Sequence, residues 1–229
     1  MKEFEDAFFI KKGAVKLVFT KRIVDGKNSK DIKKICDDYG FNFHSLNFNT
    51  QVHGTDVRLA SSINSICEAD GLVTKEQGMP LLIYTADCVP LVFYDNKQRV
   101  VALAHAGRRG TFENIGQKTL AKMVDECSCS VENIEVLIGP SISGENYAVS
   151  KDIVEKFATL KVENYYSKKA NQYYLDLWQV NKVLLQREGV LEKNIEIMNM
   201  CTVRDNDKFF SYRLENKTSK RIATIIQLD

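Results

Sequence analysis

The sequence is poor in proline, histidine and tryptophan, and it carries no large excess of either charge. Its 229 residues include 3 prolines, 3 histidines and 1 tryptophan, and 32 Lys and Arg stand against 30 Asp and Glu, for a net charge of +2. A nearly neutral chain has no broad positive field with which to attract nucleic acid or an anionic membrane. We therefore expect neither as a partner, and any bound anion must be held by a local group of residues.

Long hydrophobic runs and CxxC pairs of cysteines are also absent. No apolar stretch approaches the ~20 residues of a membrane-spanning helix, and the N-terminal MKEFEDAFFIKKG has none of the pattern of a signal peptide. The 6 cysteines are scattered without a CxxC pair, in a chain too long to need disulfide stapling. These features predict reduced thiols and a cytoplasmic protein.

The middle third of the chain is apolar and indicates β-structure. No repeat, low-complexity tract or proline-rich linker divides the sequence, so we expect one domain over residues 1–229. Uninterrupted hydrophobicity is typical of strands that are covered on both faces. Apolar runs of strand length occupy residues 81–84, 89–95, 99–105, 134–140 and 221–228.

Amphipathic segments between these runs predict three helices. Apolar residues at helical spacing predict one from Thr111 to about Glu126, with Thr111 as its N-cap. A second begins near Ser150, and a third extends from Asp176 to a stop at Gly189. The expected fold is a mixed α/β (α+β) domain, a β-sheet sandwich flanked by helices, whose strand order does not follow from the sequence.

Two histidines and one cysteine are candidates for chemistry. His53 lies beside a glycine turn in QVHGTDV, and His105 ends an apolar run in VALAHAGRRGT. Cys88 lies in YTADCVPLVFYD, where Thr85, Asp87 and Cys88 form a polar break between two apolar runs. A cysteine that only packs acts as a small hydrophobe, so these polar neighbours favour a role beyond packing.

These three residues would suit a metal ion, although each taken alone would more often be structural. Their spacing matches no zinc finger, so the fold would have to assemble the site. Two imidazoles and a thiolate are borderline-soft ligands suited to zinc, and three protein ligands leave a fourth position for water or substrate. That arrangement is typical of a catalytic site.

The segment AGRRGTFENIG, directly after His105, is a candidate anion site. Its glycines allow close backbone approach, Arg108 and Arg109 bring positive charge, and the helix expected at Thr111 offers unpaired N–H groups. Two solvated surface arginines at a turn are the alternative. Arg22, beside a turn in FTKRIVDG, is a further candidate. Polar groups in segments 138–150 and 208–221 are interpreted as ordinary loop residues.

Seven motifs in register resemble the YfiH family, once labelled laccase-like polyphenol oxidases and described as purine nucleoside phosphorylases. The resemblance extends from about Phe19 to the C-terminus and implies a fold similar to the cytotoxic-necrotizing-factor catalytic domain. It implies zinc held by His53, Cys88 and His105. The motifs are QVHGTDV, ADGLVT, TADCVPLVFYD, AHAGRRGT, IGPSIS followed by Y.VS, YYLDLWQVN and FFSYR.

The activity that the resemblance implies is phosphorolysis of adenosine, inosine, guanosine and methylthioadenosine to free base and ribose 1-phosphate, with deamination of adenosine as a second activity. We expect Arg109, Thr111 and Arg22 to hold phosphate. In deamination the metal would activate water for attack on C6 of adenine, and Asp87 would move protons. The expected catalytic residues are thus Cys88, His53, His105 and Asp87.

Other functions stay open. A cysteine-dependent hydrolase that edits peptidoglycan precursors would use Cys88 as nucleophile and His105 as base. A non-catalytic binding module is a further alternative. A multicopper oxidase needs many more than 3 histidines, so zinc is favoured over copper. Arg108 stands where the family usually has tryptophan, so the sequence does not define the substrate range. It does not define the oligomeric state either.

Overall fold

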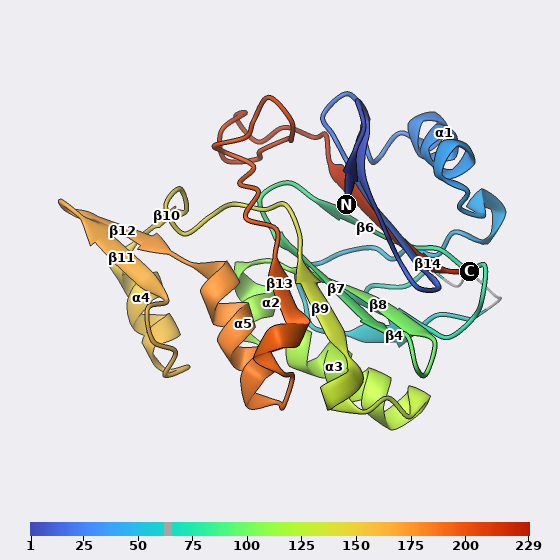
Figure 1. The fold of residues 1–229 in the computed structure, drawn as a ribbon. Helices are drawn as coiled ribbons and strands as arrows, with labels where there is room; N and C mark the ends of the chain where they lie inside the picture. Colours follow the sequence, from blue (N-terminus) through green and yellow to red (C-terminus); the bar gives the residue numbers. More distant parts are fainter. Residues whose placement is uncertain (62–65) are drawn as a thin grey trace.

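The computed structural model describes residues 1–61 and 66–229, which form four layers around two face-to-face sheets (Figure 1). The first sheet is antiparallel, in the order β1-β2-β3-β14-β6. The C-terminal strand therefore lies between an N-terminal strand and one from the middle of the chain. The strands are β1 (Lys2–Glu3), β2 (Ala7–Lys12), β3 (Val15–Thr20), β6 (Leu81–Thr85) and β14 (Ile222–Leu228).

The second sheet has the order β13-β9-β7-β8-β5-β4. Its inner pairs are antiparallel, whereas the edge strands β13 and β4 pair in parallel with their neighbours. Every residue of β7 and β8 is buried, which confirms that these apolar runs are covered on both faces. The strands are β4 (Val57–Leu59), β5 (Gly71–Thr74), β7 (Val89–Asp95), β8 (Val100–Ala106), β9 (Glu135–Ile138) and β13 (Ile195–Ile197).

Helices cover the outer faces of both sheets. Helix α1 (Ser29–Tyr39) packs on the first sheet, and α3 (Ile115–Cys127) and α5 (Leu177–Arg187) pack on the second. Helix α4 (Lys151–Ala158) lies beside a small third sheet. That sheet has the order β10-β12-β11, formed by β10 (Ala148–Val149), β11 (Tyr166–Lys169) and β12 (Gln172–Leu175). Single 3-10 turns occur at Phe43–Ser45, Val131–Asn133 and Glu192–Asn194.

The expected sandwich flanked by helices is confirmed, and so are two of the three predicted helices. Helix α4 follows Ser150, and α5 is capped by the Asp176 side chain, which accepts a hydrogen bond from the backbone N–H of Gln179. Gly189, just after α5, has the left-handed φ of 99° that suits a helix stop.

The predicted N-cap at Thr111 is wrong. Two helices occupy this region, α2 (Arg108–Phe112) after Gly107 and α3 after Asn114, whose φ of 70° bends the chain between them. Thr111 lies inside α2. Its buried hydroxyl donates to the carbonyl of Ala106 (3.3 Å) and accepts from the Asn181 amide (3.1 Å), so it ties α2 to β8 and α5 and caps neither helix.

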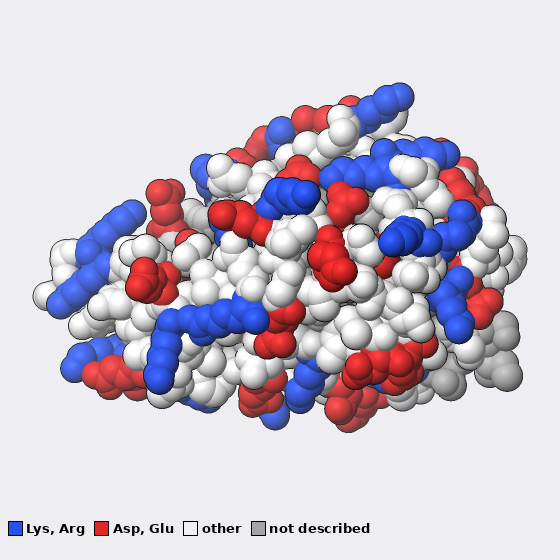
Figure 2. Space-filling view, turned by 60° about the horizontal axis from the view of Figure 1, so that its bottom comes forward, with Lys and Arg blue, Asp and Glu red and all other residues white. Residues whose placement is uncertain are grey.

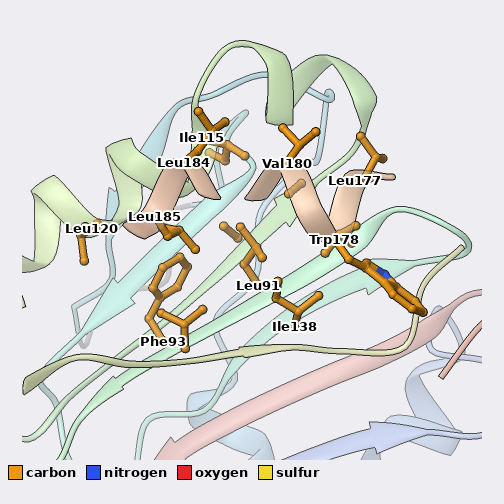
Figure 3. Close-up of a cluster of buried hydrophobic side chains, with 14 of the residues drawn as sticks. Leu91, Phe93, Ile115, Leu120, Ile138, Leu177, Trp178, Val180, Leu184 and Leu185 are labelled. Carbon is orange, nitrogen blue, oxygen red and sulfur yellow. The ribbon is translucent and has the colours of Figure 1, made fainter. Parts of the chain in front are cut away.

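The core between the second sheet and its helices is continuous. Figure 3 shows Leu91 and Phe93 of β7 facing Leu184 and Leu185 of α5, with Ile115 of α3 beside them. Burying a side chain of this size stabilises the fold by about 1.5–3 kcal/mol relative to exposing it. This packing holds β7 and β8, which carry the site, in a rigid layer.

No helix among residues 1–61 and 66–229 is long and apolar enough to cross a membrane. Figure 2 shows a face on which basic and acidic side chains are interspersed, without a large region of one sign. This pattern agrees with the small net charge of the sequence.

We predict that Leu185→Ala lowers the free energy of unfolding by about 2–5 kcal/mol, because it leaves a cavity between α5 and the sheet. Leu185 is 0% exposed, whereas Leu191 is 40% exposed and offers the same substitution as a control. Leu191→Ala should change stability by less than about 0.5 kcal/mol. Urea denaturation measures both, and equal losses would contradict this account of the core.

Candidate metal centre and adjoining cavities

The structure brings together His53, Cys88 and His105, which we call the ligand cluster. One ligand atom of each lies within 4.8 Å of the others, and the two imidazole rings meet edge to face with centroids 4.7 Å apart. Strand register explains the meeting of Cys88 and His105. Pro90 pairs with His105 and Val89 with Ala106, so Cys88 lies beside the end of β8. The backbone at Gly107 also approaches closely, since a Cβ there would lie 3.1 Å from the Cys88 Sγ.

A turn before β4 supplies His53. The side chain of Gln51 holds this turn against β6, because its amide accepts from the N–H of Tyr84 (2.7 Å) and donates to the carbonyl of Tyr84 (2.8 Å). His53 itself has a left-handed φ of 58°, a conformation that non-glycine residues rarely adopt. Surrounding contacts must therefore hold it in place.

Asp70, directly before β5, makes those contacts. Its buried carboxylate accepts hydrogen bonds from three successive backbone N–H groups, those of Val52 (3.1 Å), His53 (3.0 Å) and Gly54 (2.7 Å). Successive N–H groups that converge in this way form a concave anion-binding nest. The carboxylate thus fixes the turn that presents His53.

The same carboxylate orients His105. The Nδ1 of His105 lies 2.7 Å from Asp70 Oδ1, and since an ionised carboxylate only accepts, Nδ1 must carry the proton. The Nε2 atom is left to face Cys88 and His53. A histidine ligand held by a carboxylate through its other nitrogen is the usual arrangement at protein metal sites.

Charges within the cluster shift its pKa values. Burial alone would raise the pKa of Cys88, but the charges of His105 and His53 and their hydrogen bonds to the thiol lower it from 9.0 to about 6. Burial would lower the pKa of His105, yet the Cys88 thiolate and Asp70 raise it to about 9. Near neutral pH the metal-free cluster is therefore a thiolate beside an imidazolium. Burial alone would raise the pKa of Asp70, but its hydrogen bonds with His105 and Gly54 lower that pKa below its ordinary value.

Two adjoining cavities open onto the cluster. We call one, of about 490 Å³, the glutamine cavity, because Gln51 lines it together with Asn49, Tyr84 and Thr85. We call the other, of about 470 Å³, the arginine cavity, because Arg108, Arg109 and Arg213 line it together with Asp87 and Tyr147. The two cavities share His53, Ala86, Cys88 and Tyr212. A molecule in either cavity would lie beside the ligand cluster.

Asp87, expected as an acid/base, lies in the arginine cavity. Its side chain accepts from the hydroxyl of Thr202 and from the backbone N–H of Arg213, both at 2.6 Å, and its carbonyl accepts from the N–H of Ile142 (3.0 Å). With a left-handed φ of 83°, Asp87 joins three distant segments next to Cys88.

The expected phosphate residues are spread over different surroundings. Arg109 lines the arginine cavity and pairs with Glu113 (2.9 Å). Thr111 is buried, and its hydroxyl is used in the hydrogen bonds that link α2 to β8 and α5. Arg22 lines neither cavity; its guanidinium binds the backbone of Asn206 and the carboxylate of Glu215. The structure thus does not bring these three side chains together.

Comparison with known proteins identifies the family. The family model described as "Multi-copper polyphenol oxidoreductase laccase" matches residues 26–229. The chain belongs to this family. A purine nucleoside phosphorylase of Bacteroides thetaiotaomicron is 35% identical over 163 residues, which cover 69% of this chain and 60% of that protein. The purine nucleoside phosphorylase SSP1584 of Staphylococcus saprophyticus is 34% identical over 201 residues, covering 86% of this chain and 69% of that protein.

Solved structures share the fold of this laccase-family chain. The hypothetical protein YfiH of Bacillus licheniformis superposes with a TM-score of 0.91 at 23% identity, over 99% of this chain and 98% of that one. YlmD of Geobacillus stearothermophilus gives the same TM-score and identity, over 100% and 98%. At this identity the likeness concerns the fold alone.

Sequence reasoning missed several residues of the site. Asp70 carried a signal, since a lone acid directly before a fully buried strand needs partners for its charge. Tyr147, Tyr212 and Arg213 were expected to be ordinary loop residues, but all three line the arginine cavity. Nothing in their spacing links them to Cys88, because the link is made by the hydrogen bonds of Asp87.

We predict that Asp70→Asn weakens zinc binding by about 10–100-fold, because it removes the carboxylate that orients His105 and the turn of His53. Competition with a chromogenic chelator measures the affinity. Asp56→Asn is a matched control, since Asp56 lies in the same region with an exposed side chain. Equal affinities of Asp70→Asn and the wild type, in folded protein, would contradict the role of Asp70.

We also predict that Cys88 of metal-free protein reacts with iodoacetamide as a thiolate. The rate should level off above about pH 7, because its pKa is about 6, whereas Cys36, with a pKa raised by burial to about 11, should stay unreacted. Bound zinc should block the reaction at Cys88. Peptide mass spectrometry reads each site, and a Cys88 rate that still climbs through pH 9 would contradict the thiolate assignment.

Proposed function

We propose that the chain is a zinc-dependent purine nucleoside phosphorylase that converts a purine nucleoside and phosphate into free base and ribose 1-phosphate. The observation that carries the proposal is the ligand cluster at the junction of two cavities, each large enough for a small molecule. Two cavities beside one cluster suit a reaction of two substrates. The names of the relatives at 34–35% identity support the same activity.

The donor set of the cluster fits zinc. In a tetrahedral zinc site the ligand atoms lie about 3.3–3.8 Å apart, which the observed grouping within 4.8 Å accommodates with small side-chain movements. Two histidines and a cysteine also bind copper in electron-transfer sites, where a weak methionine ligand completes the set. Among the described residues that line the cavities none is methionine, so we propose zinc. Zinc would act as a Lewis acid toward substrate or water.

The chain's own residues would hold the substrates around this point. We place the nucleoside in the glutamine cavity, where Thr85 has a buried hydroxyl that finds no partner in the described part of the chain. Such a group is satisfied when a ligand or water supplies a hydrogen bond. Tyr212, on the wall that both cavities share, offers an aromatic face to a purine.

Deamination of adenosine is the second activity that we propose for this site. Asp87 is the candidate to move the proton, because it lies next to Cys88 and a carboxylate that accepts two hydrogen bonds keeps further lone pairs free. Water would add at C6 of adenine and ammonia would leave, so the product would be inosine, which the same cavity would accept for phosphorolysis.

We predict that zinc-loaded protein consumes inosine only when phosphate is present and releases hypoxanthine and ribose 1-phosphate. Cys88→Ala should reduce the rate by more than about 100-fold, because it removes a metal ligand. Cys67→Ser, which replaces an exposed thiol outside both cavities and keeps a donor toward Asn49, should leave the rate unchanged. Chromatography of the purines measures the reaction, with adenosine as a parallel substrate to detect inosine.

The outcomes separate the proposed activities. Unchanged inosine and adenosine with zinc fully bound would rule out the phosphorylase. Conversion of adenosine to inosine without cleavage of the glycosidic bond would support the deaminase activity and contradict the phosphorylase activity.

A cysteine-dependent hydrolase is the second candidate function. The thiolate and imidazolium of the metal-free cluster favour it, because in this state the histidine base has already taken the thiol proton and left a nucleophilic thiolate. The two candidates respond in opposite ways to the metal. Chelation would abolish phosphorolysis, whereas it would free Cys88 for hydrolysis of a peptidoglycan precursor.

A further inference from the structure

We propose that the arginine cavity is the phosphate subsite and that Arg108 and Arg213 hold the anion there. The inference deepens the proposed function and rests on it. It replaces the expected set of Arg109, Thr111 and Arg22 by two arginines that the sequence alone did not link to each other.

The charges around this cavity are unbalanced. Three arginines and one carboxylate, that of Asp87, line it. Arg109 is already paired with Glu113. Within residues 1–61 and 66–229, the guanidinium of Arg108 has no hydrogen bond or ion pair. The guanidinium of Arg213 donates to the carbonyl of Ala148 (2.9 Å) and lies over the ring of Tyr147, and among the same residues it has no ion pair. Two cations without acidic partners thus face one small cavity.

The side chain of Tyr147 contacts one of these arginines, Arg213, and lines the cavity together with the other. The Arg213 guanidinium lies over its ring at 5.0 Å, a cation–π contact that limits the orientation of the guanidinium. Burial raises the pKa of Tyr147, and the charges that act on this phenol are those of Arg108, Cys88, Arg213 and Asp87. Arg108, Arg213, Cys88 and Tyr147 all line this one cavity.

The backbone also directs each arginine to the cavity. Arg108 follows Gly107, whose close approach to Cys88 places the start of α2 against the cluster. The N–H of Arg213 donates to Asp87, the residue before Cys88. Arg108 and Arg213 are 105 positions apart in the sequence, yet these two contacts bring both beside the same thiol.

Phosphate is the anion that suits this place. Guanidinium groups bind phosphate oxygens through paired N–H donors, with charge-assisted hydrogen bonds. A cavity of about 470 Å³ takes a small anion, and the net charge of +2 supplies no field for a polyanion. Since His53 and Cys88 line both cavities, a phosphate in the arginine cavity and a nucleoside in the glutamine cavity would meet at the ligand cluster.

The reaction balances with these two substrates alone. An oxygen of monohydrogen phosphate forms a bond to C1′ of the ribose while the bond from C1′ to the purine nitrogen breaks. The electron pair of the breaking bond goes to that nitrogen. The proton of the phosphate ends on the base, so the products are ribose 1-phosphate and neutral purine.

The test compares Arg108→Gln and Arg213→Gln with the wild type. Each variant should raise the KM for phosphate by about 10–100-fold, because a charged hydrogen-bond donor is lost, and should change the KM for inosine by less than about 3-fold. Arg204→Gln is the control, since Arg204 pairs with Asp205 and lines neither cavity. Arg108→Lys and Arg213→Lys, which keep the charge without the planar fork, should give intermediate values.

A second measurement does not depend on turnover. Titration of zinc-loaded protein with inorganic phosphate, followed by ³¹P NMR without nucleoside, should show binding that both glutamine variants weaken and Arg204→Gln does not. An inactive wild type that still binds phosphate in this pattern would overturn the phosphorylase and support the subsite. An active wild type whose phosphate KM is the same in both glutamine variants, with circular dichroism showing them folded, would overturn the subsite alone.

Discussion

A buried carboxylate, that of Asp70, joins the two histidine-bearing segments of the ligand cluster. It holds the turn of His53 through three backbone N–H groups and fixes the tautomer of His105 through Nδ1. An ionised carboxylate is tolerated at such depth only when its lone pairs are satisfied, and here four donors satisfy them. The strained backbone conformation of His53 is maintained because these hydrogen bonds hold the residues on both sides of it in place.

The junction between the two sheets supplies the third ligand. Strand β6 belongs to the first sheet and β7 to the second, so the chain must cross from one to the other between Thr85 and Val89. Cys88 lies in this crossing and Asp87 beside it. Asp87 then holds the segments that carry Ile142, Thr202 and Arg213 around the thiol. One short connection thus places a reactive thiol, a cavity wall and a basic residue together.

Local charge explains how a nearly neutral protein would bind an anion. Acidic and basic side chains are interspersed on the face shown in Figure 2, and several described ion pairs are exposed and contribute little to stability. Arg108 and Arg213 differ from these pairs because, among the described residues, neither guanidinium has an ion pair and both line one cavity. Under the proposed function, the cluster and its cavities would combine a soft metal site with an anion site within one family fold.

Much of this protein follows from the sequence by itself. Apolar runs of strand length determined β6 to β9 and β14, and the chemistry of imidazole and thiolate singled out His53, Cys88 and His105 before any geometry was known. The predicted cap at Asp176 is confirmed, whereas the one at Thr111 is wrong, because tertiary hydrogen bonds hold that residue inside α2. Only the tertiary structure decided the strand order, the role of Asp70, and the meeting of Arg108, Tyr147 and Arg213 beside Cys88. The physical reason is that periodicity reports which face of an element is buried, whereas a site depends on contacts between distant segments that no local pattern encodes.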